Sequence, residues 1–122
     1  LDHFKRVNDT LSHDVGDEVL RQLATLLETA AGDGFAARMG GEEFLLVLPG
    51  LEPDHALARC EQLRLDVADY PWHPLTGDVP VRVSVGVVSV FAGHDTMSQL
   101  LSEADRRLYV SKRSGRNRVT GD

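Results

Sequence analysis

The sequence has 122 residues, a length that suits one domain built around a single hydrophobic core. Hydrophobic residues make up 42% and charged residues 26% of the chain, a composition typical of a soluble globular domain rather than a disordered tail or a membrane span. The formal net charge of -6 repels a polyanionic backbone and argues against nucleic-acid binding as the main function. A small anionic ligand remains compatible with this charge if metal ions screen the acidic groups.

Cysteine content and hydropathy indicate the compartment. Cys60 is the only cysteine, which excludes an intrachain disulfide and a thiolate metal cluster. We interpret Cys60 as a small buried hydrophobe. No apolar run approaches the roughly 20 residues of a membrane helix. We therefore expect a cytoplasmic domain without direct membrane contact, and leave open a membrane anchor elsewhere in a longer parent protein.

Hydrophobic periodicity and turn residues predict the elements in chain order. An amphipathic helix follows Gly16 and ends near Ala30, with Asp14 or Asp17 as its N-cap. A strand over 35–38 and a buried strand over 44–48 form a β-hairpin with Gly40 to Glu43 at its tip. Next come a helix from Asp54 to about Tyr70, an irregular segment over 72–80, a strand over 81–90, a helix over about 98–113 and an edge strand over 118–120.

This order lacks only an opening strand to form a βαββαβ core with additions. The sequence therefore predicts a ferredoxin-like α/β (α+β) fold whose opening strand is absent from this chain.

The hairpin tip, Gly40-Gly41-Glu42-Glu43-Phe44, is the most informative stretch. Its glycines allow a sharp turn and a close approach to a ligand, and its adjacent carboxylates are hard oxygen ligands of the kind that Mg²⁺ prefers. A solvated polar turn explains the same residues, and on this stretch alone it is the better explanation.

Three further stretches carry candidate binding residues. Near the start, Lys5 is suited to a phosphate and Asn8 to a base edge, although on this stretch alone a helix capped by Asp2 with solvated basic residues is the better explanation. Asp17 is able to accept from both the N1 and the N2 donors of guanine, or to act as a helix cap. The basic cluster over 112–118 either holds an anion or complements a helix dipole.

Taken together, these stretches resemble the GGDEF family of diguanylate cyclases, and the resemblance covers essentially the whole chain. The matching motifs are Asp-x-Phe-Lys-x-Val-Asn-Asp, His-Asp-Val-Gly-Asp-Glu-Val-Leu, Arg-x-Gly-Gly-Glu-Glu-Phe, Val-Ser-Val-Gly-Val and Ala-Asp-x-x-Leu-Tyr-x-x-Lys-x-x-Gly-Arg-Asn. Several motifs in the family's order and at compatible spacing make the family resemblance a better explanation than a solvated turn, helix caps and a helix-dipole charge taken one by one. The resemblance implies a nucleotidyl-cyclase-like fold.

The resemblance also implies a reaction. Each domain of a homodimer would hold one GTP with two Mg²⁺ ions, or Mn²⁺ in their place, and each 3′-hydroxyl would attack the partner's α-phosphate to give cyclic di-GMP and pyrophosphate. Glu42 and Glu43 match the family's metal-binding carboxylates, and Glu42 would also help to deprotonate the 3′-hydroxyl. The carbonyl of Leu1 would be a further metal ligand.

The remaining site residues follow from the same resemblance. Asn8 and Asp17 would read guanine, and Asp17 favours GTP because a related subfamily that accepts ATP carries a smaller residue there. The signature loop comprises Gly40, Gly41 and Phe44, in which the glycines make room. The groups that would bind phosphate are the backbone N–H groups near His3 and Phe4 and the side chains of Lys5, Lys112 and Arg116.

The chain departs from the family pattern in three places. Ala31 and Gly34 stand where the family's inhibitory site has Arg and Asp, so that site is expected to be absent, and Ser12 replaces a usual glycine. The family's first metal-binding aspartate would immediately precede Leu1. We therefore expect residues 1–122 to be a GGDEF domain truncated at its N-terminus, without its first helix and strand, and by itself unstable and inactive.

An alternative function is a catalytically silent GTP-binding or dimerising regulatory module. Such modules usually carry a damaged signature, whereas Glu42 and Glu43 are both present here. The sequence therefore favours the enzyme.

Overall fold

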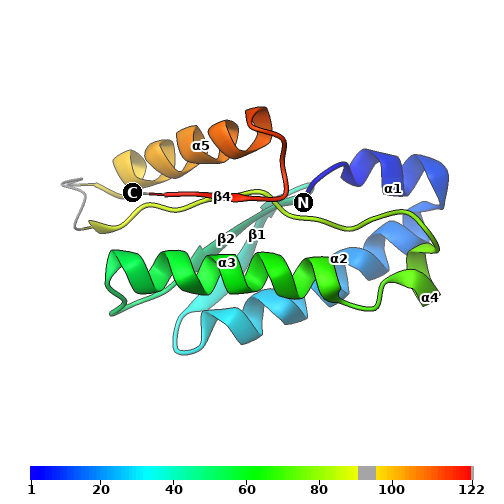
Figure 1. Cartoon of the computed structure of the whole chain (residues 1–122), viewed down its shortest axis with the longest axis horizontal. Helices are drawn as coiled ribbons and strands as arrows, with labels where there is room; N and C mark the ends of the chain where they lie inside the picture. Colours follow the sequence, from blue (N-terminus) through cyan, green and yellow to red (C-terminus); the bar gives the residue numbers. More distant parts are fainter. Residues whose placement is uncertain (91–95, 122) are drawn as a thin grey trace.

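The computed structural model of the chain describes residues 1–90 and 96–121 (Figure 1). Its helices are α1 (Phe4–Thr10), α2 (His13–Ala31), α3 (Pro53–Asp69), α4 (His73–Thr76) and α5 (Met97–Arg113). Its strands are β1 (Phe35–Gly40), β2 (Glu43–Val47), β3 (Val85–Gly86) and β4 (Val119–Thr120).

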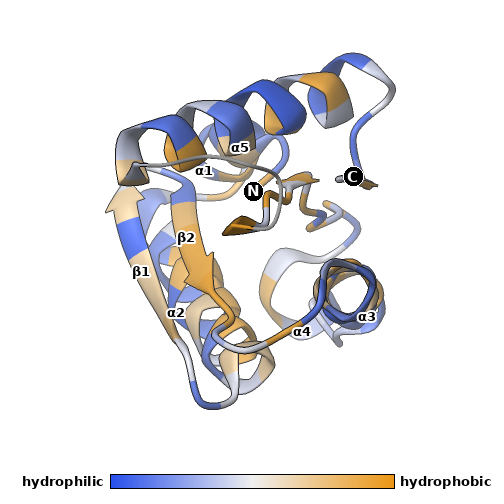
Figure 2. Ribbon diagram, turned by 90° about the vertical axis from the view of Figure 1, so that its left-hand side faces the viewer, coloured by the Kyte–Doolittle hydropathy of each residue, from blue (hydrophilic) through white to orange (hydrophobic). Residues whose placement is uncertain are grey.

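Helices lie on both sides of the strands. Helices α2 and α3 pack against each other on one side, and α5 packs on β3 and β4 from the other side (Figures 1 and 2). The buried core lies mainly between α1, α2, α3 and the extended segment before β3. Its members are apolar side chains: Phe4, Val7, Val19, Leu20, Leu23, Leu27, Leu63, Val67, Trp72, Val81 and Val83. The hydrophobic effect of burying these side chains is what holds the layers together.

The predicted hairpin is confirmed. Strands β1 and β2 pair antiparallel with Phe35 opposite Val47 and Arg38 opposite Phe44, and the register shifts between Arg38 and Gly40. The β2 ribbon is largely apolar, as expected for a strand that packs on α2 (Figure 2).

Strands β3 and β4 pair in parallel, with Val85 opposite Val119. The strand predicted over 81–90 is therefore much shorter than expected, because β4 offers backbone partners only around Val85 and Val87. The described residues form two separate two-stranded sheets, β1-β2 and β3-β4. The expected opening strand in the sheet interior stays a prediction.

Two helix caps differ from the sequence-based prediction. Helix α2 begins at His13 and its N-cap is Ser12, whose hydroxyl accepts from the N–H of Val15 at 3.1 Å, so neither Asp14 nor Asp17 caps it. Helix α1 has His3 at its N-cap without a side-chain cap, so Asp2 is not a cap either.

The segment expected to be irregular over 72–80 includes the short helix α4. The prediction for Cys60 is confirmed, since it is buried and burial raises the pKa of its thiol to about 11.

Gly86 allows α5 to lie directly on β3. A Cβ atom at this position would be 2.2 Å from the carbonyl oxygen of Ala104 and 2.3 Å from the backbone nitrogen of Leu108. Both atoms belong to the helix backbone, which cannot move aside as a flexible side chain can. Glycine in a strand often marks such a close approach.

We expect Gly86→Ala to lower the free energy of unfolding by about 1–3 kcal/mol, because the added methyl group pushes α5 away from β3. Urea unfolding of the intact protein measures this change. Ser102→Ala, on the exposed surface of α5, is the matched control and should leave stability nearly unchanged. Equal midpoints for Gly86→Ala and the control would contradict the close packing.

Candidate functional site

The hairpin between β1 and β2 ends in a tight turn that carries two adjacent carboxylates. Gly41 has a φ of 49°, a left-handed conformation that favours glycine. The Nε of Arg38 donates to the carbonyl of Gly41 at 2.8 Å and fixes the turn from the strand side. Glu42 is half-buried and Glu43 is exposed. The turn thus presents both carboxylates at the surface on a well-held backbone.

The N-terminus of the chain meets this turn. The backbone nitrogen of Leu1 donates to the carbonyl of Glu42 at 3.3 Å, across a sequence separation of 41 residues. The start of the chain and the hairpin therefore come together at one place.

Asp2 links this place to two other segments. Its carboxylate is buried, and Oδ1 accepts from the hydroxyl of Ser84 at 2.7 Å while Oδ2 accepts from the N–H of Asn117 at 3.0 Å. Its own N–H donates to the carbonyl of Arg82 at 2.8 Å. The role of Asp2 was missed from the sequence. The Val-Ser-Val-Gly-Val motif contained the signal, because a serine in an otherwise apolar strand needs a buried polar partner.

Asn8 lies where α1 packs on α2. A Cβ atom at Gly16 would be 1.9 Å from the Oδ1 of Asn8, so only glycine leaves room for the amide. This oxygen is buried and has no hydrogen-bond partner among the described residues. Since buried polar atoms are normally satisfied, the Asn8 amide fits a site that a polar ligand completes.

Asp17 follows Gly16 directly and lies on the second turn of α2, exposed and free of any capping role. It lines a cavity of about 500 Å³ between α2 and the β1-β2 hairpin. The other lining residues are Leu20, Arg21, Ala24, Glu28, Ala36, Ala37, Arg38 and Phe44. Asp17 thus faces a surface hollow, whereas Asn8 lies outside its lining.

The basic residues at the other end of the chain are held by the end of α5. Lys112 is in the last turn of the helix, and Gly115 has a φ of 117°. The N–H of Arg116 donates back to the carbonyl of Ser111 at 3.0 Å, the bond of a Schellman motif. Arg116 is exposed, and Lys5 is exposed on α1.

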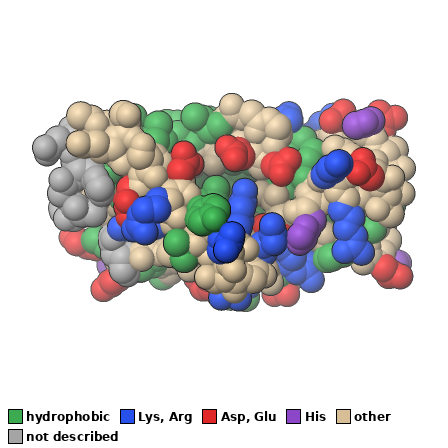
Figure 3. All heavy atoms as spheres, turned by 90° about the horizontal axis from the view of Figure 1, so that it is seen from above, with side chains coloured by type: hydrophobic (Ala, Val, Ile, Leu, Met, Phe, Trp, Pro, Cys, Tyr) green, Lys and Arg blue, Asp and Glu red, His purple; other side chains and the backbone are tan. Residues whose placement is uncertain are grey.

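Charges of both signs occur on this side of the molecule. Viewed from above, a row of carboxylates lies beside a group of Lys and Arg side chains (Figure 3).

A magnesium ion fits the donors at the hairpin tip only together with a ligand. The described residues contain no group of three or more His, Cys, Asp or Glu side chains placed to hold a metal ion. Magnesium, however, is usually bound by one or two carboxylates together with phosphate and water oxygens. Glu42, Glu43 and the carbonyl of Leu1 have the right chemistry for such a shared site.

The positions expected to lack an inhibitory site are tightly packed. Ala31 is buried, and a Cβ atom at Gly34 would be 1.7 Å from the carbonyl oxygen of Val47. Position 34 therefore has no room for a side chain of any kind in this backbone arrangement. A side chain at position 34 would therefore require the hairpin to move, and the expected absence of the inhibitory site stays a prediction.

Comparison with known families identifies the family of the chain. The family model for "Diguanylate cyclase, GGDEF domain" matches residues 1–118. The chain therefore belongs to the GGDEF domain family of diguanylate cyclases.

Two relatives illustrate how much of a longer protein the chain matches. It is 39% identical over 124 residues to the response regulator PleD of Caulobacter vibrioides, covering 99% of this chain and 27% of PleD. It is 37% identical over 119 residues to a diguanylate cyclase of Vibrio cholerae, covering 97% of this chain and 36% of that protein. The chain thus spans well under half the length of these relatives.

Solved structures confirm the fold class. The active GGEEF domain of a diguanylate cyclase from Vibrio cholerae superposes with a TM-score of 0.89 at 36% identity, covering 98% of this chain and 76% of that one. The GGDEF domain of DgcB from Caulobacter crescentus, in complex with c-di-GMP, gives a TM-score of 0.86 at 35% identity, covering 98% and 72%. The nucleotidyl-cyclase-like α/β fold is confirmed. Among the described residues, no helix is both long and apolar enough to cross a bilayer.

Because Ser12 caps α2, we expect Ser12→Ala to lower the free energy of unfolding by about 1 kcal/mol. Asp17→Ala should leave it nearly unchanged, since Asp17 has no capping role. Urea unfolding of both variants of the intact protein measures the difference. If Asp17→Ala lowered the free energy of unfolding more than Ser12→Ala does, Asp17 would have a structural role.

Proposed function

We propose that this domain acts as a diguanylate cyclase, a GTP:GTP guanylyltransferase that condenses two GTP molecules into cyclic di-GMP and two pyrophosphates. One observation carries the proposal: the paired carboxylates Glu42 and Glu43 lie on a tight glycine turn, and the start of the chain contacts this turn through the bond between the backbone nitrogen of Leu1 and the carbonyl of Glu42. Adjacent carboxylates suit a ligand that brings both metal ions and phosphates.

The hairpin tip would hold the metal ions. Glu42 and Glu43, with the carbonyl of Leu1, would bind two Mg²⁺ ions, or Mn²⁺, that neutralise charge on the triphosphate. Glu42, which is half-buried, would accept the proton of the attacking 3′-hydroxyl. Gly41 keeps the turn compact enough for the phosphates to approach the backbone.

Basic groups would hold the phosphates around this tip. Lys5, Lys112 and the exposed Arg116 would supply side-chain donors. The backbone N–H groups near His3 and Phe4, at the start of α1, would supply further donors. In phosphoryl transfer, positioning and charge neutralisation provide most of the acceleration. These residues need only hold the α-phosphate in line with its attacker.

Guanine would bind at the junction of α1 and α2. The Asn8 amide, with its unsatisfied buried oxygen, and the Asp17 carboxylate would pair with the base edge. A carboxylate accepts from both N1 and N2 of guanine, a pairing that adenine does not offer. Each domain binds one GTP, so ring closure requires a homodimer in which two sites face each other.

We expect Glu43→Gln to abolish cyclic di-GMP formation and to leave the fold intact, because it removes one charge from the metal site. The assay incubates the intact protein with GTP and Mg²⁺ and measures product by chromatography, with circular dichroism to verify folding. Asp105→Asn, an exposed carboxylate on α5, is the control and should keep full activity. Undiminished activity in Glu43→Gln would refute the metal-ligand assignment.

The same assay separates the enzyme from a regulatory module. A wild-type protein that binds GTP and forms no cyclic di-GMP would be the silent alternative.

We expect Asp17→Ala to weaken GTP binding by about 1.5–3 kcal/mol, the usual value of a charged hydrogen bond, and to leave ATP binding nearly unchanged. Isothermal titration in a Glu43→Gln background, where turnover is blocked, measures both nucleotides. Thr25→Ala, an exposed position further along α2, is a suitable control. Equal weakening of GTP and ATP would show that Asp17 does not read the base.

A further inference from the structure

Residues 115–118 form a turn, named here the Arg116 turn, with an uncommon backbone. Gly115 has a φ of 117°, and it is followed by Arg116 at 63° and Asn117 at 47°. Left-handed conformations are uncommon for residues other than glycine, and they persist only where the surroundings hold them in place. Two consecutive residues of this kind indicate that several contacts fix the turn.

The contacts come from different parts of the molecule. The N–H of Arg116 bonds to Ser111 at the end of α5, and the N–H of Asn117 bonds to the buried carboxylate of Asp2 at 3.0 Å. Within the turn, the Nε of Arg118 donates to the carbonyl of Arg116 at 3.1 Å. These bonds hold the backbone and leave the side chain of Asn117 to be held separately.

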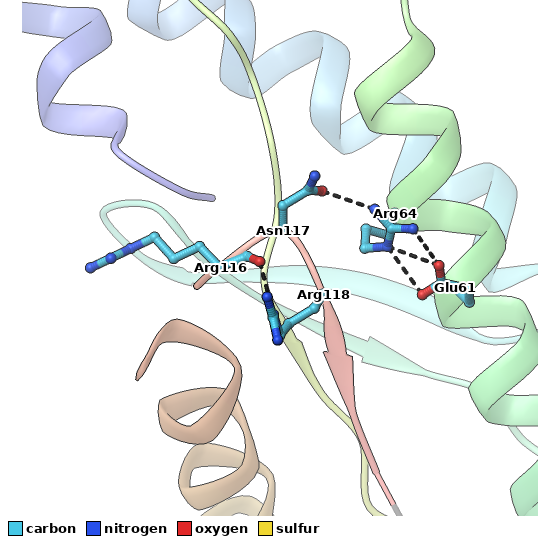
Figure 4. A network of polar contacts seen from close by, with 5 residues as sticks. All are labelled: Glu61, Arg64, Arg116, Asn117 and Arg118. Atoms are coloured by element: carbon cyan, nitrogen blue, oxygen red, sulfur yellow. Dashed lines mark hydrogen bonds and ion pairs between the residues drawn. The ribbon is translucent and has the colours of Figure 1, made fainter. Parts of the chain in front are cut away.

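Arg64 on α3 holds that side chain. Its Nη1 donates to the Oδ1 of Asn117 at 3.1 Å, across 53 residues of sequence. Its Nε donates to both carboxylate oxygens of Glu61 at 3.0 and 3.1 Å, and its Nη2 also donates to Glu61 (Figure 4). The side chain of Arg64 is only 17% exposed. Glu61 thus aims the Arg64 guanidinium at Asn117, and the hydrogen bond from Arg64 lowers the pKa of Glu61.

The side chain of Arg116 extends away from this contact (Figure 4). Arg64 therefore approaches the turn from one side, and Arg116 leaves it on another. The donors of Arg64 that face Glu61 and Asn117 are occupied, so its connection to Arg116 runs through the backbone of Asn117. A change in the Asn117 conformation redirects the preceding residue, because adjacent backbone dihedrals set the direction of Arg116.

We propose that Arg64, aimed by Glu61, is a positioning residue of the phosphate site: through Asn117 it holds the turn that presents Arg116 to the nucleotide phosphates. This inference rests on the proposed function, in which Arg116 binds phosphate.

Helix α5 offers a matched control. Arg106 pairs with Glu103 at the same i, i+3 spacing as Arg64 with Glu61. Within the part of the chain that the structure describes, the hydrogen bonds of Arg106 stay on its own helix. Loss of Arg106 therefore removes a similar ion pair without touching the Arg116 turn.

The test titrates GTP with Mg²⁺, and separately guanosine, into variants of the intact protein that all carry Glu43→Gln to prevent turnover. We expect Arg64→Ala and Arg116→Ala each to raise the Kd for GTP by about tenfold, equivalent to about 1.4 kcal/mol. Guanosine binding should stay unchanged, because Asn8 and Asp17 are untouched. Arg106→Ala should match the Glu43→Gln background for both ligands.

A double variant separates positioning from general support of the fold. Arg64→Ala combined with Arg116→Ala should bind GTP as Arg116→Ala does, since Arg64 acts through Arg116. Asn117→Ala, which leaves the Glu61–Arg64 pair in place, should reproduce the loss seen in Arg64→Ala. It also provides the test if Arg64→Ala does not fold.

Three results would overturn the inference. GTP affinity unchanged in both Arg64→Ala and Asn117→Ala, with Arg116→Ala weakened, would exclude the positioning role and leave the proposed function standing. Equal weakening of GTP and guanosine would reveal a purely structural role. If Arg116→Ala itself binds GTP normally, the proposed phosphate contact fails, and the inference fails with it.

Discussion

The buried carboxylate of Asp2 joins three segments that are distant in sequence. It accepts from the hydroxyl of Ser84 and from the N–H of Asn117, while its own N–H pairs with Arg82. A buried carboxylate is unfavourable unless it is hydrogen-bonded, and each hydrogen bond to a charged group contributes about 1.5–3 kcal/mol. The start of α1, the strand segment and the Arg116 turn are therefore held in a single arrangement. The proposed phosphate-binding residues near His3 and at Arg116 both depend on it.

The hairpin tip is organised differently, because its function requires exposed charge. A left-handed Gly41 and the bond from Arg38 keep the turn compact, and the β1-β2 pairing behind it sets its position. The carboxylates of Glu42 and Glu43 can then lie at the surface, with no side-chain partner among the residues that the structure describes. The single bond from Leu1 to Glu42 connects this tip to the segment that Asp2 anchors.

Local packing around small residues makes these approaches possible. Gly86 lets α5 contact β3, and Gly16 lets the amide of Asn8 lie against α2. A methyl group at Gly16 would push apart two helices that each carry proposed site residues, and one at Gly86 would push α5, which carries Lys112, away from β3. Gly34 lets the carbonyl of Val47 approach in the same way.

The sequence by itself determined the family, the order of helices and strands, the hairpin with its paired carboxylates and the burial of Cys60. These features depend on local periodicity, turn residues and motif spacing, all of which are readable along the chain. The tertiary structure alone decided that the Asp2 carboxylate is buried and accepts from the N–H of Asn117 instead of capping a helix. It also decided that Ser12 caps α2 and that Arg64 reaches Asn117 across 53 residues. The strand predicted over 81–90 is limited to Val85–Gly86 in the structure, because a strand extends only where a neighbouring strand supplies backbone hydrogen bonds. Such contacts join residues far apart in sequence, and no local pattern encodes which distant partner a side chain meets.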